Sequence, residues 1–181
     1  MISDEPDDDE DFRQFVVAQI DGLRRLAYLT CGNWQAADDA VSTGLTKLYL
    51  AWRKVNTPHW YARRVVVNAA IDEVRRPWRR EQVAEPEFLD RSVPDPTAEL
   101  AERARIQQAL LKIPPGQRKV LLLRFYEDLS VEDTAEILGK STGTIKSQTA
   151  RGLAALHRVL GEAPWGESDD SGRFASLVRR G

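Results

Sequence analysis

The sequence predicts an all-α protein of two small helical domains joined by an acidic linker that contains prolines. Apolar residues recur at helical spacing along most of the chain, and no segment shows the alternation of a strand. The helical pattern breaks over EQVAEPEFLDRSVPDP, where Pro86, Pro94 and Pro96 disfavour a helix. We therefore expect an acidic N-terminal tail over residues 1–11, a first domain over 12–80, the linker over 81–97, a second domain over 98–160 and a C-terminal extension over 161–181.

The first domain is expected to hold three or four helices. Residues 12–30 place apolar side chains near helical spacing, and residues 34–55 follow with a core stripe of Val41, Leu45, Leu48 and Trp52. Gly44 lies inside this second helix, where it should cost about 1 kcal/mol relative to alanine. Pro58 then starts a third helix, which runs from Trp60 to about residue 76 and is interrupted by Pro77.

The second domain begins with a helix over residues 97–113, which Pro114 and Pro115 stop, and a segment over 117–126. A helix-turn-helix follows. Ser130 is a natural N-cap with Asp133 at the capping-box position, and Gly139 suits a left-handed C-cap. Residues 142–160 resume helical periodicity, with an inward stripe of Ile145, Thr149, Leu153, Leu156 and Leu160.

The last of these helices carries positive charge and no acid. Residues 139–160 contain four Lys or Arg and no Asp or Glu. The small residues Ser147, Ala150 and Gly152 beside Lys146 and Arg151 suit close approach to DNA, so we expect insertion into the major groove. The alternative is an ordinary helical hairpin with a solvated basic face.

The net charge of −2 hides a strong segregation of charge along the chain. Residues 1–11 hold seven acids and no base, residues 53–80 hold eight bases against two acids, and residues 81–102 hold seven acids against one base. Such alternation suits a nucleic-acid binder whose acidic segments connect or screen its basic modules.

A second candidate surface lies on the third helix, where spacings of three and four residues place five polar side chains on one face: Arg64, Asn68, Asp72, Arg75 and Arg79. Arginine grips phosphate, and the neighbouring aromatics could hold unstacked bases; these are Trp60, Tyr61 and Trp78. In the alternative interpretation the helix is merely solvated and Trp60 and Tyr61 belong to the core.

Nothing in the sequence points to catalysis. One cysteine excludes an intramolecular disulfide, and with two histidines besides, neither a metal site nor a cofactor is expected. We find no glycine-rich phosphate loop and no Ser-His-Asp arrangement. No apolar run reaches membrane-spanning length and the N-terminus is acidic, so a cytoplasmic chain without membrane insertion is expected. In the C-terminal extension, Phe174, Leu177 and Val178 allow a short amphipathic helix, although a frayed terminus is the simpler expectation.

Two segments together resemble the extracytoplasmic-function sigma factors of bacterial RNA polymerase. PPGQRKVLLLRFYEDLSVEDTAEILGKSTGTIKSQTARGLAAL is similar to the sigma-four domain, and AADDAVSTGLTKLYLAW followed by WYARRVVVNAAIDEVRR is similar to sigma-two. The resemblance covers roughly residues 12–160. It implies promoter DNA and core RNA polymerase, through its β′ clamp helices and β flap, as partners. It also allows an anti-sigma factor as a third partner.

The resemblance also implies roles for individual residues. Those matching the polymerase-docking helix are Asp38, Asp39, Ser42, Thr43 and Lys47, although the family pattern usually has a Gln–Glu pair where this chain has Ser42 and Thr43. Those matching the part that melts and reads the minus-ten element are Arg64, Asn68, Asp72, Arg75 and Arg76. Those matching the reader of the minus-thirty-five element are Arg124, Thr144, Lys146, Ser147, Ala150 and Arg151.

Two other classes of function remain open from the residues. One is a stand-alone helix-turn-helix regulator that binds a palindrome as a dimer without polymerase. The other is a helical adaptor that uses its charged faces for protein contacts. A stand-alone regulator does not need the docking helix together with the polar face from Arg64 to Arg79.

Overall fold

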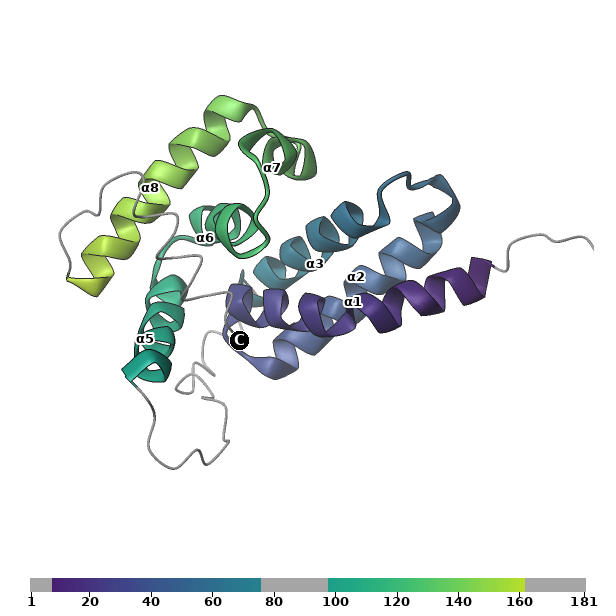
Figure 1. Ribbon diagram of the computed structural model, residues 1–181, viewed down its shortest axis with the longest axis horizontal. Coiled ribbons are helices and arrows are strands. Elements are labelled where there is room, and N and C mark those ends of the chain that lie inside the picture. Colours follow the sequence, from purple (N-terminus) through teal and green to yellow (C-terminus); the bar gives the residue numbers. More distant parts are fainter. Residues whose placement is uncertain (1–7, 76–97, 162–181) are drawn as a thin grey trace, which may run out of the picture.

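The computed structural model describes residues 8–75 and 98–161, and within these ranges every regular element is a helix (Figure 1). The expected all-α fold with two helical domains is confirmed. The linker over 81–97 and the C-terminal extension beyond Gly161 lie outside the described residues, as do Arg76, Trp78 and Arg79.

The first domain is a bundle of three long helices: α1 (Asp8–Cys31), α2 (Trp34–Ala51) and α3 (Pro58–Arg75), with a 3-10 turn η1 (Trp52–Lys54) after α2. Gly32, at φ 78°, makes the turn between α1 and α2, and the Asn33 side chain caps α2 by accepting from the Ala36 N–H at 2.9 Å. The core between the helices contains mainly small and branched side chains, among them Ala37, Ala40, Val41, Leu48, Val66 and Ala70.

The second domain contains α5 (Ala98–Lys112), α6 (Pro115–Leu121), a π-helical turn η2 (Leu122–Tyr126), α7 (Val131–Leu138) and α8 (Thr142–Leu160). The expected caps are confirmed. The Ser130 hydroxyl accepts from the Asp133 N–H at 2.9 Å while the Asp133 carboxylate accepts from the Ser130 N–H, and Gly139 has φ 60°. These caps explain why α7 is short and where the chain turns into α8.

The structure gives Gly44 a role that helix propensity does not reveal. A β-carbon on Gly44 would lie 2.5 Å from Val66 Cγ2 and 3.2 Å from the Val66 backbone nitrogen. The missing side chain therefore lets α2 and α3 approach each other closely. The propensity cost expected from the sequence is offset by this packing, so alanine is not the better residue here.

The two domains also pack against each other. One buried cluster contains Leu26 and Leu29 of α1 and Val67 and Ile71 of α3, together with side chains of the second domain: Ile106, Ala109, Leu110, Ile113, Leu121, Leu122, Leu123, Phe125, Ile137 and Leu156. In Figure 1, α6 and α7 lie beside α3, with which α7 makes direct contact. The second domain thus covers part of the first.

Within the described ranges, no helix has both the length and the apolar character needed to cross a bilayer.

Candidate nucleic-acid interface

Helix α8 presents its central polar side chains to solvent. Lys146, Ser147, Ala150 and Arg151 are all exposed, whereas Ile145 and Leu156 on the opposite side are fully buried. The Ser141 hydroxyl caps the helix by accepting from the Thr144 N–H at 3.2 Å. The Thr144 hydroxyl lies 2.9 Å from the same oxygen. The predicted minus-thirty-five residues of α8 therefore lie in the first half of this helix, on the side that does not pack against the domain core (the free side of α8).

Gly152 does not belong to that free surface. It is buried, and a β-carbon on it would lie 3.1 Å from Leu121 Cγ of α6. Its small size therefore serves the packing of α8 on α6, and counting it with Ser147 and Ala150 as a feature of the DNA face was wrong. The same α6–α8 contact holds the exposed side of α8 outward.

Arg124 has structural contacts that the sequence did not predict. It lies in η2, where its Nη1 donates to the Leu129 carbonyl and its guanidinium carbon sits 5.7 Å from the Phe125 ring centroid. These contacts hold the loop between η2 and α7. Arg124 thereby supports the helix-turn-helix, whatever it contacts outside the chain.

The predicted minus-ten residues lie on α3, but at the boundary with the second domain. Arg64, Asp72 and Arg75 are exposed, while Asn68 is half-buried and its amide oxygen accepts from Lys119 Nζ of α6 at 3.4 Å. The pKa of Lys119 is lowered, chiefly by burial and then by the positive charges of Lys140 and Arg75. Basic groups from both domains thus meet beside Asn68.

Two aromatic neighbours of this face, Trp60 and Tyr61, are partly buried against the core. Trp60 packs against the cluster that the two domains share, and Tyr61 packs against the core of the first domain. For these two residues the structure supports the simpler alternative, in which their rings fill space between helices. Neither ring is free to stack on a base in this conformation.

The five predicted polymerase-docking residues are all exposed along α2: Asp38, Asp39, Ser42, Thr43 and Lys47. Asp38 and Ser42 line an open groove between α1 and α2, whose other walls are Phe12, Ile20, Arg24, Val41, Leu45, Thr46 and Tyr49. The groove therefore combines apolar walls with a polar rim.

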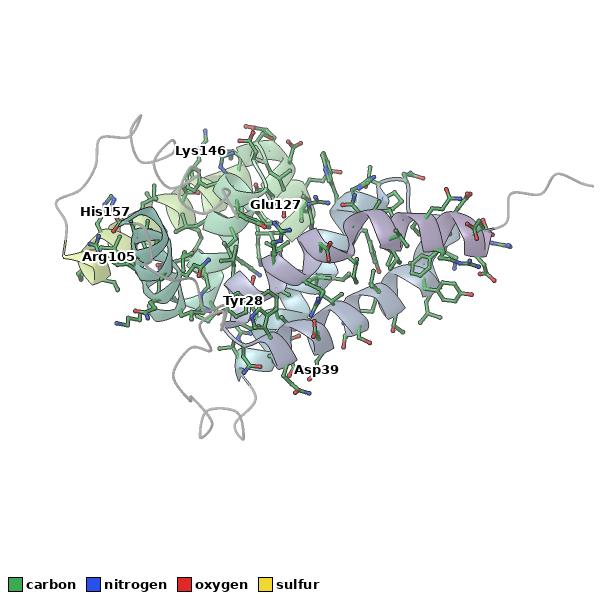
Figure 2. The ribbon with its side chains drawn as sticks, turned by 60° about the horizontal axis from the view of Figure 1, so that its bottom comes forward. Tyr28, Asp39, Arg105, Glu127, Lys146 and His157 are labelled. Carbon is green, nitrogen blue, oxygen red and sulfur yellow. The ribbon has the colours of Figure 1, made fainter. Side chains whose placement is uncertain are left out.

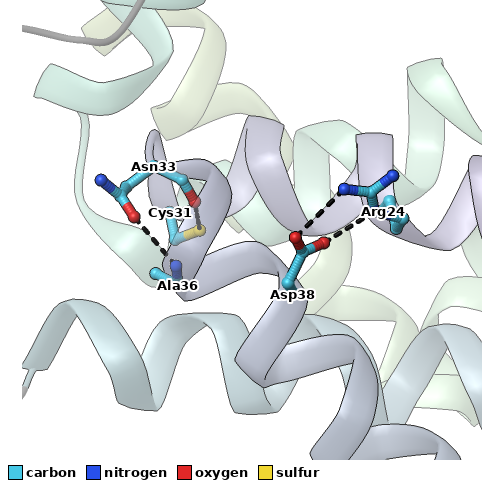
Figure 3. A network of polar contacts seen from close by, with 5 residues as sticks. All are labelled: Arg24, Cys31, Asn33, Ala36 and Asp38. Atoms are coloured by element: carbon cyan, nitrogen blue, oxygen red, sulfur yellow. Dashed lines mark hydrogen bonds and ion pairs between the residues drawn. The ribbon is translucent and has the colours of Figure 1, made fainter.

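Arg24 of α1 fixes Asp38 at the rim of this groove. Its Nε and Nη2 donate to the two carboxylate oxygens at 2.6 and 3.0 Å, a forked geometry that Figure 3 shows. The bond to Asp38 raises the pKa of Arg24. The guanidinium also lies 5.7 Å from the centroid of Trp34, which stacks on Tyr28. Sequence reasoning missed Arg24 because its partner lies on another helix.

The two exposed surfaces point in different directions. Figure 2 shows Lys146 of α8 and Asp39 of α2 on opposite sides of the molecule, with Glu127 between them. Among the described residues, no three His, Cys, Asp or Glu side chains gather into a group that could hold a metal ion.

Comparison with known proteins matches the two helical domains separately. Residues 16–80 match the family Sigma-70 region 2, and residues 103–156 match the family Sigma-70, region 4. The chain is 35% identical over 153 residues to the RNA polymerase sigma-E factor of Streptomyces avermitilis, covering 83% of this chain and 85% of that protein. It is 34% identical over 142 residues to the ECF RNA polymerase sigma factor SigM of Mycobacterium tuberculosis, covering 77% and 71%.

A solved structure shares the fold. It is the sigma factor RpoE in complex with the anti-sigma factor NepR from Bartonella quintana, with a TM-score of 0.63 and 24% identity, covering 84% of this chain and 98% of that chain. The sequence relatives establish the family on their own. The chain therefore belongs to the extracytoplasmic-function group of the sigma-70 family of RNA polymerase sigma factors.

Proposed function

We propose that this sigma factor binds core RNA polymerase and reads promoter DNA twice, as duplex with α8 and as separated strands with α3. The observation that carries the proposal is the free side of α8, an acid-free helix that presents Lys146, Ser147, Ala150 and Arg151 from a capped helix-turn-helix. The role is one of recognition without catalysis, in the cytoplasm where polymerase and promoter meet.

Duplex reading rests on charge and on side-chain size. Lys146 and Arg151 supply positive charge for the phosphates or for guanine edges, while Ser147 and Ala150 leave room for the groove walls between them. The N-terminus of α8 adds a favourable dipole for phosphate. Binding should therefore weaken steeply as salt rises, because neutralised phosphates release counterions.

Strand opening is assigned to the polar face of α3. The amide of Asn68 can both donate to and accept from the edge of an unpaired base, and the exposed Arg64 and Arg75 of the same helix are proposed to hold phosphates. Unstacking a base costs a few kcal/mol, which capture of that base offsets. Arg76 is proposed for the same role, although it lies outside the described residues.

Polymerase binding is assigned to the side of α2 that carries Asp39, Thr43 and Lys47 and to the adjoining groove. The apolar groove walls supply buried area, and the exposed charges on α2 supply complementarity with the partner. Ser42 and Thr43 are uncharged, so Asp39 and Lys47 supply the exposed charges on this side of α2.

The test is promoter-dependent transcription in vitro. Adding the purified chain to core polymerase on a pooled promoter library should produce discrete run-off transcripts that core polymerase alone does not make. Lys47→Glu should weaken capture by core polymerase, because it reverses a charge on the proposed docking surface. Lys54→Glu makes the same charge change at an exposed residue of η1 and should bind like wild type.

Failure has a specific form. The proposal is wrong if core polymerase neither co-elutes with the chain in gel filtration nor starts specific transcripts with it. A homodimer that binds a palindromic duplex equally well with and without polymerase would instead support a stand-alone regulator.

A further inference from the structure

The sole cysteine of the chain lies at the junction of α1 and α2. Cys31 is the last residue of α1, and its Sγ donates to the Asn33 carbonyl at 3.4 Å across the turn at Gly32 (Figure 3). The thiol is half-buried and packs against the edge of the core of the first domain. Its partial exposure leaves room for a small molecule to approach the sulfur.

A buried arginine of the second domain is anchored beside this cysteine. Arg118 of α6 is 3% exposed, and its Nη1 donates to the carbonyl of Thr30, the residue directly before Cys31. Its Nη2 donates to the Leu111 carbonyl at 2.8 Å. The Leu111 side chain lies against the residue directly after the cysteine, since a β-carbon on Gly32 would be 2.6 Å from Leu111 Cδ1. Both chain neighbours of the cysteine therefore contact the residues that hold the guanidinium.

Within the described chain, the positive charge of this guanidinium has no carboxylate partner. Its hydrogen-bond acceptors there are main-chain carbonyls, and its Nε is buried without an acceptor. Burial is the chief cause that lowers the pKa of Arg118 to about 10, and among the described residues the charge that opposes this shift is the Cys31 thiolate. A buried cation with an unused donor favours an anion beside it. Cys31 is placed to supply that anion.

Two effects act against a thiolate at this place, and both are weakened here. The C-terminal end of a helix disfavours negative charge because of its unsatisfied carbonyls. In α1, however, the Tyr28 carbonyl accepts from the Gly32 N–H at 2.6 Å and the Thr30 carbonyl accepts from Arg118. Burial in apolar surroundings also disfavours a thiolate, but Cys31 is only partly buried while its cation is almost completely buried. A full charge in a site of low dielectric outweighs the partial charges that remain.

We propose that Cys31 is a site of reversible S-thiolation, in which the buried guanidinium of Arg118 activates the thiol toward small disulfides. After the thiol proton has passed to water, the thiolate attacks one sulfur of the disulfide. A bond forms between Cys31 Sγ and that sulfur, and the other half of the disulfide leaves as a thiolate. The cysteine is oxidised and the departing sulfur is reduced, so the exchange needs no further reactant. A second small thiol reverses the step in the same way.

The adduct changes the charge balance around Arg118. Before reaction the thiolate offsets the buried cation, whereas the sulfur of a mixed disulfide is neutral and leaves the cation without an anion. The adduct must also fit beside Gly32, where Leu111 fills the space that a side chain would occupy. Modification should therefore weaken packing at this end of α1 and lower the stability of the chain, which gives the chain a response to the thiol redox state of its surroundings. This reactivity does not depend on the proposed reading of promoter DNA.

The test is the rate at which the full chain reacts with dithiobis(nitrobenzoate), a small disulfide that releases a coloured thiolate. Between about pH 6 and about pH 8.5 the thiolate fraction of an ordinary cysteine rises about 150-fold, and its reaction rate rises with it. The rate at Cys31 should rise less than about 30-fold over the same range, because Arg118 keeps part of the thiol ionised at the lower pH. This ratio of rates within one protein does not depend on how exposed the sulfur is.

The control is Cys31→Ser with Ala18→Cys, which moves the cysteine to an exposed position of the same helix. It should show the ordinary rise in rate. Arg118→Met removes the charge but keeps a long side chain, and should bring Cys31 to the ordinary rise as well. The comparison of the wild-type chain with the control decides the question without this variant, should the methionine prevent folding.

A second measurement follows the effect on stability. Oxidised glutathione at Cys31 should lower the thermal midpoint of the chain by roughly 2–4 °C, and dithiothreitol should restore it, whereas the same adduct at residue 18 of the control should leave the midpoint unchanged. The proposal is overturned if Cys31 does not react in the folded chain or shows the same rise in rate as the control. It is equally overturned if folded Arg118→Met keeps the wild-type pH profile, or if the adduct at Cys31 leaves the midpoint unchanged.

Discussion

Gly44→Ala should destabilise this protein although alanine is the better helix former. Alanine in place of glycine inside a helix is favoured by about 1 kcal/mol. The added β-carbon, however, would lie 2.5 Å from Val66 Cγ2, 3.2 Å from the Val66 nitrogen and 3.3 Å from its Cα. The methyl group could turn away only if χ1 of a fully buried valine changed, and the two backbone atoms cannot move without shifting α3.

The magnitude follows from the difference between these two effects. Overpacking of a tight core costs about 1–3 kcal/mol, and a clash with backbone belongs near the upper end of that range. Subtraction of the propensity gain leaves a net loss of about 1–2 kcal/mol in the free energy of unfolding. With a urea m-value of about 2 kcal/mol/M, the unfolding midpoint should fall by roughly 0.5–1 M.

Gly22→Ala is the matched control. Gly22 also lies inside a long helix, α1, but nothing lies within 4 Å of the position of its β-carbon. Alanine there should raise the free energy of unfolding by about 0.5–1 kcal/mol. Urea unfolding of both variants, followed by circular dichroism at 222 nm, tests the contrast.

A double-mutant cycle isolates the contact. If the clash is the cause, Gly44→Ala should cost less in a Val66→Ala background, where Cγ2 is absent. The reasoning is refuted if Gly44→Ala is as stabilising as Gly22→Ala, or if its cost is the same with and without the valine methyl groups.

The remaining predictions concern DNA reading and one helix cap. Arg151→Ala should lose about 1–3 kcal/mol of duplex affinity if it contacts a base, measured at fixed salt, while Arg158→Ala near the end of α8 should lose much less; equal losses would indicate general electrostatics instead. Asn68→Ala should leave duplex binding intact but reduce permanganate reactivity at the minus-ten element, and a wild-type footprint would remove Asn68 from that role. Ser130→Ala should lower the free energy of unfolding by about 1 kcal/mol, because α7 loses its capping box; an unchanged urea midpoint would show that the cap does not limit stability.

The boundaries of α7 and α8 were predictable because local caps set them, whereas α1 begins at Asp8, inside the segment that was expected to be an acidic tail. Residues 142–160 were expected to be helical, and α8 runs over that range because Ser141 caps its start and Gly161 ends it with φ 68°. The pattern from Ser130 to Gly139 predicted α7 in the same way. Caps and breakers act over three or four residues, so they can be read without knowing the fold.

Exposure of the candidate site was predictable only in part. The polar residues of α2 and the centre of α8 face solvent as the helical spacing indicated. Gly152 was assigned to the DNA face on its residue type, and for Trp60 the sequence left open whether the ring stacks on bases or belongs to the core. Both residues meet side chains from distant parts of the chain. Periodicity tells which residues share a face of a helix, but it does not tell what that face meets.

From the sequence alone came the all-α class, the order of the helices, their caps and the alternation of charge, since each depends on neighbours along the chain. Tertiary structure decided which glycine allows a close helix crossing, which arginine is buried, and how the two domains lie against each other. Those outcomes depend on atoms brought together from positions far apart, such as Arg118 and Thr30 or Arg63 and Glu127. Contact free energies at such places depend on distance and burial, and neither quantity exists until the chain has folded.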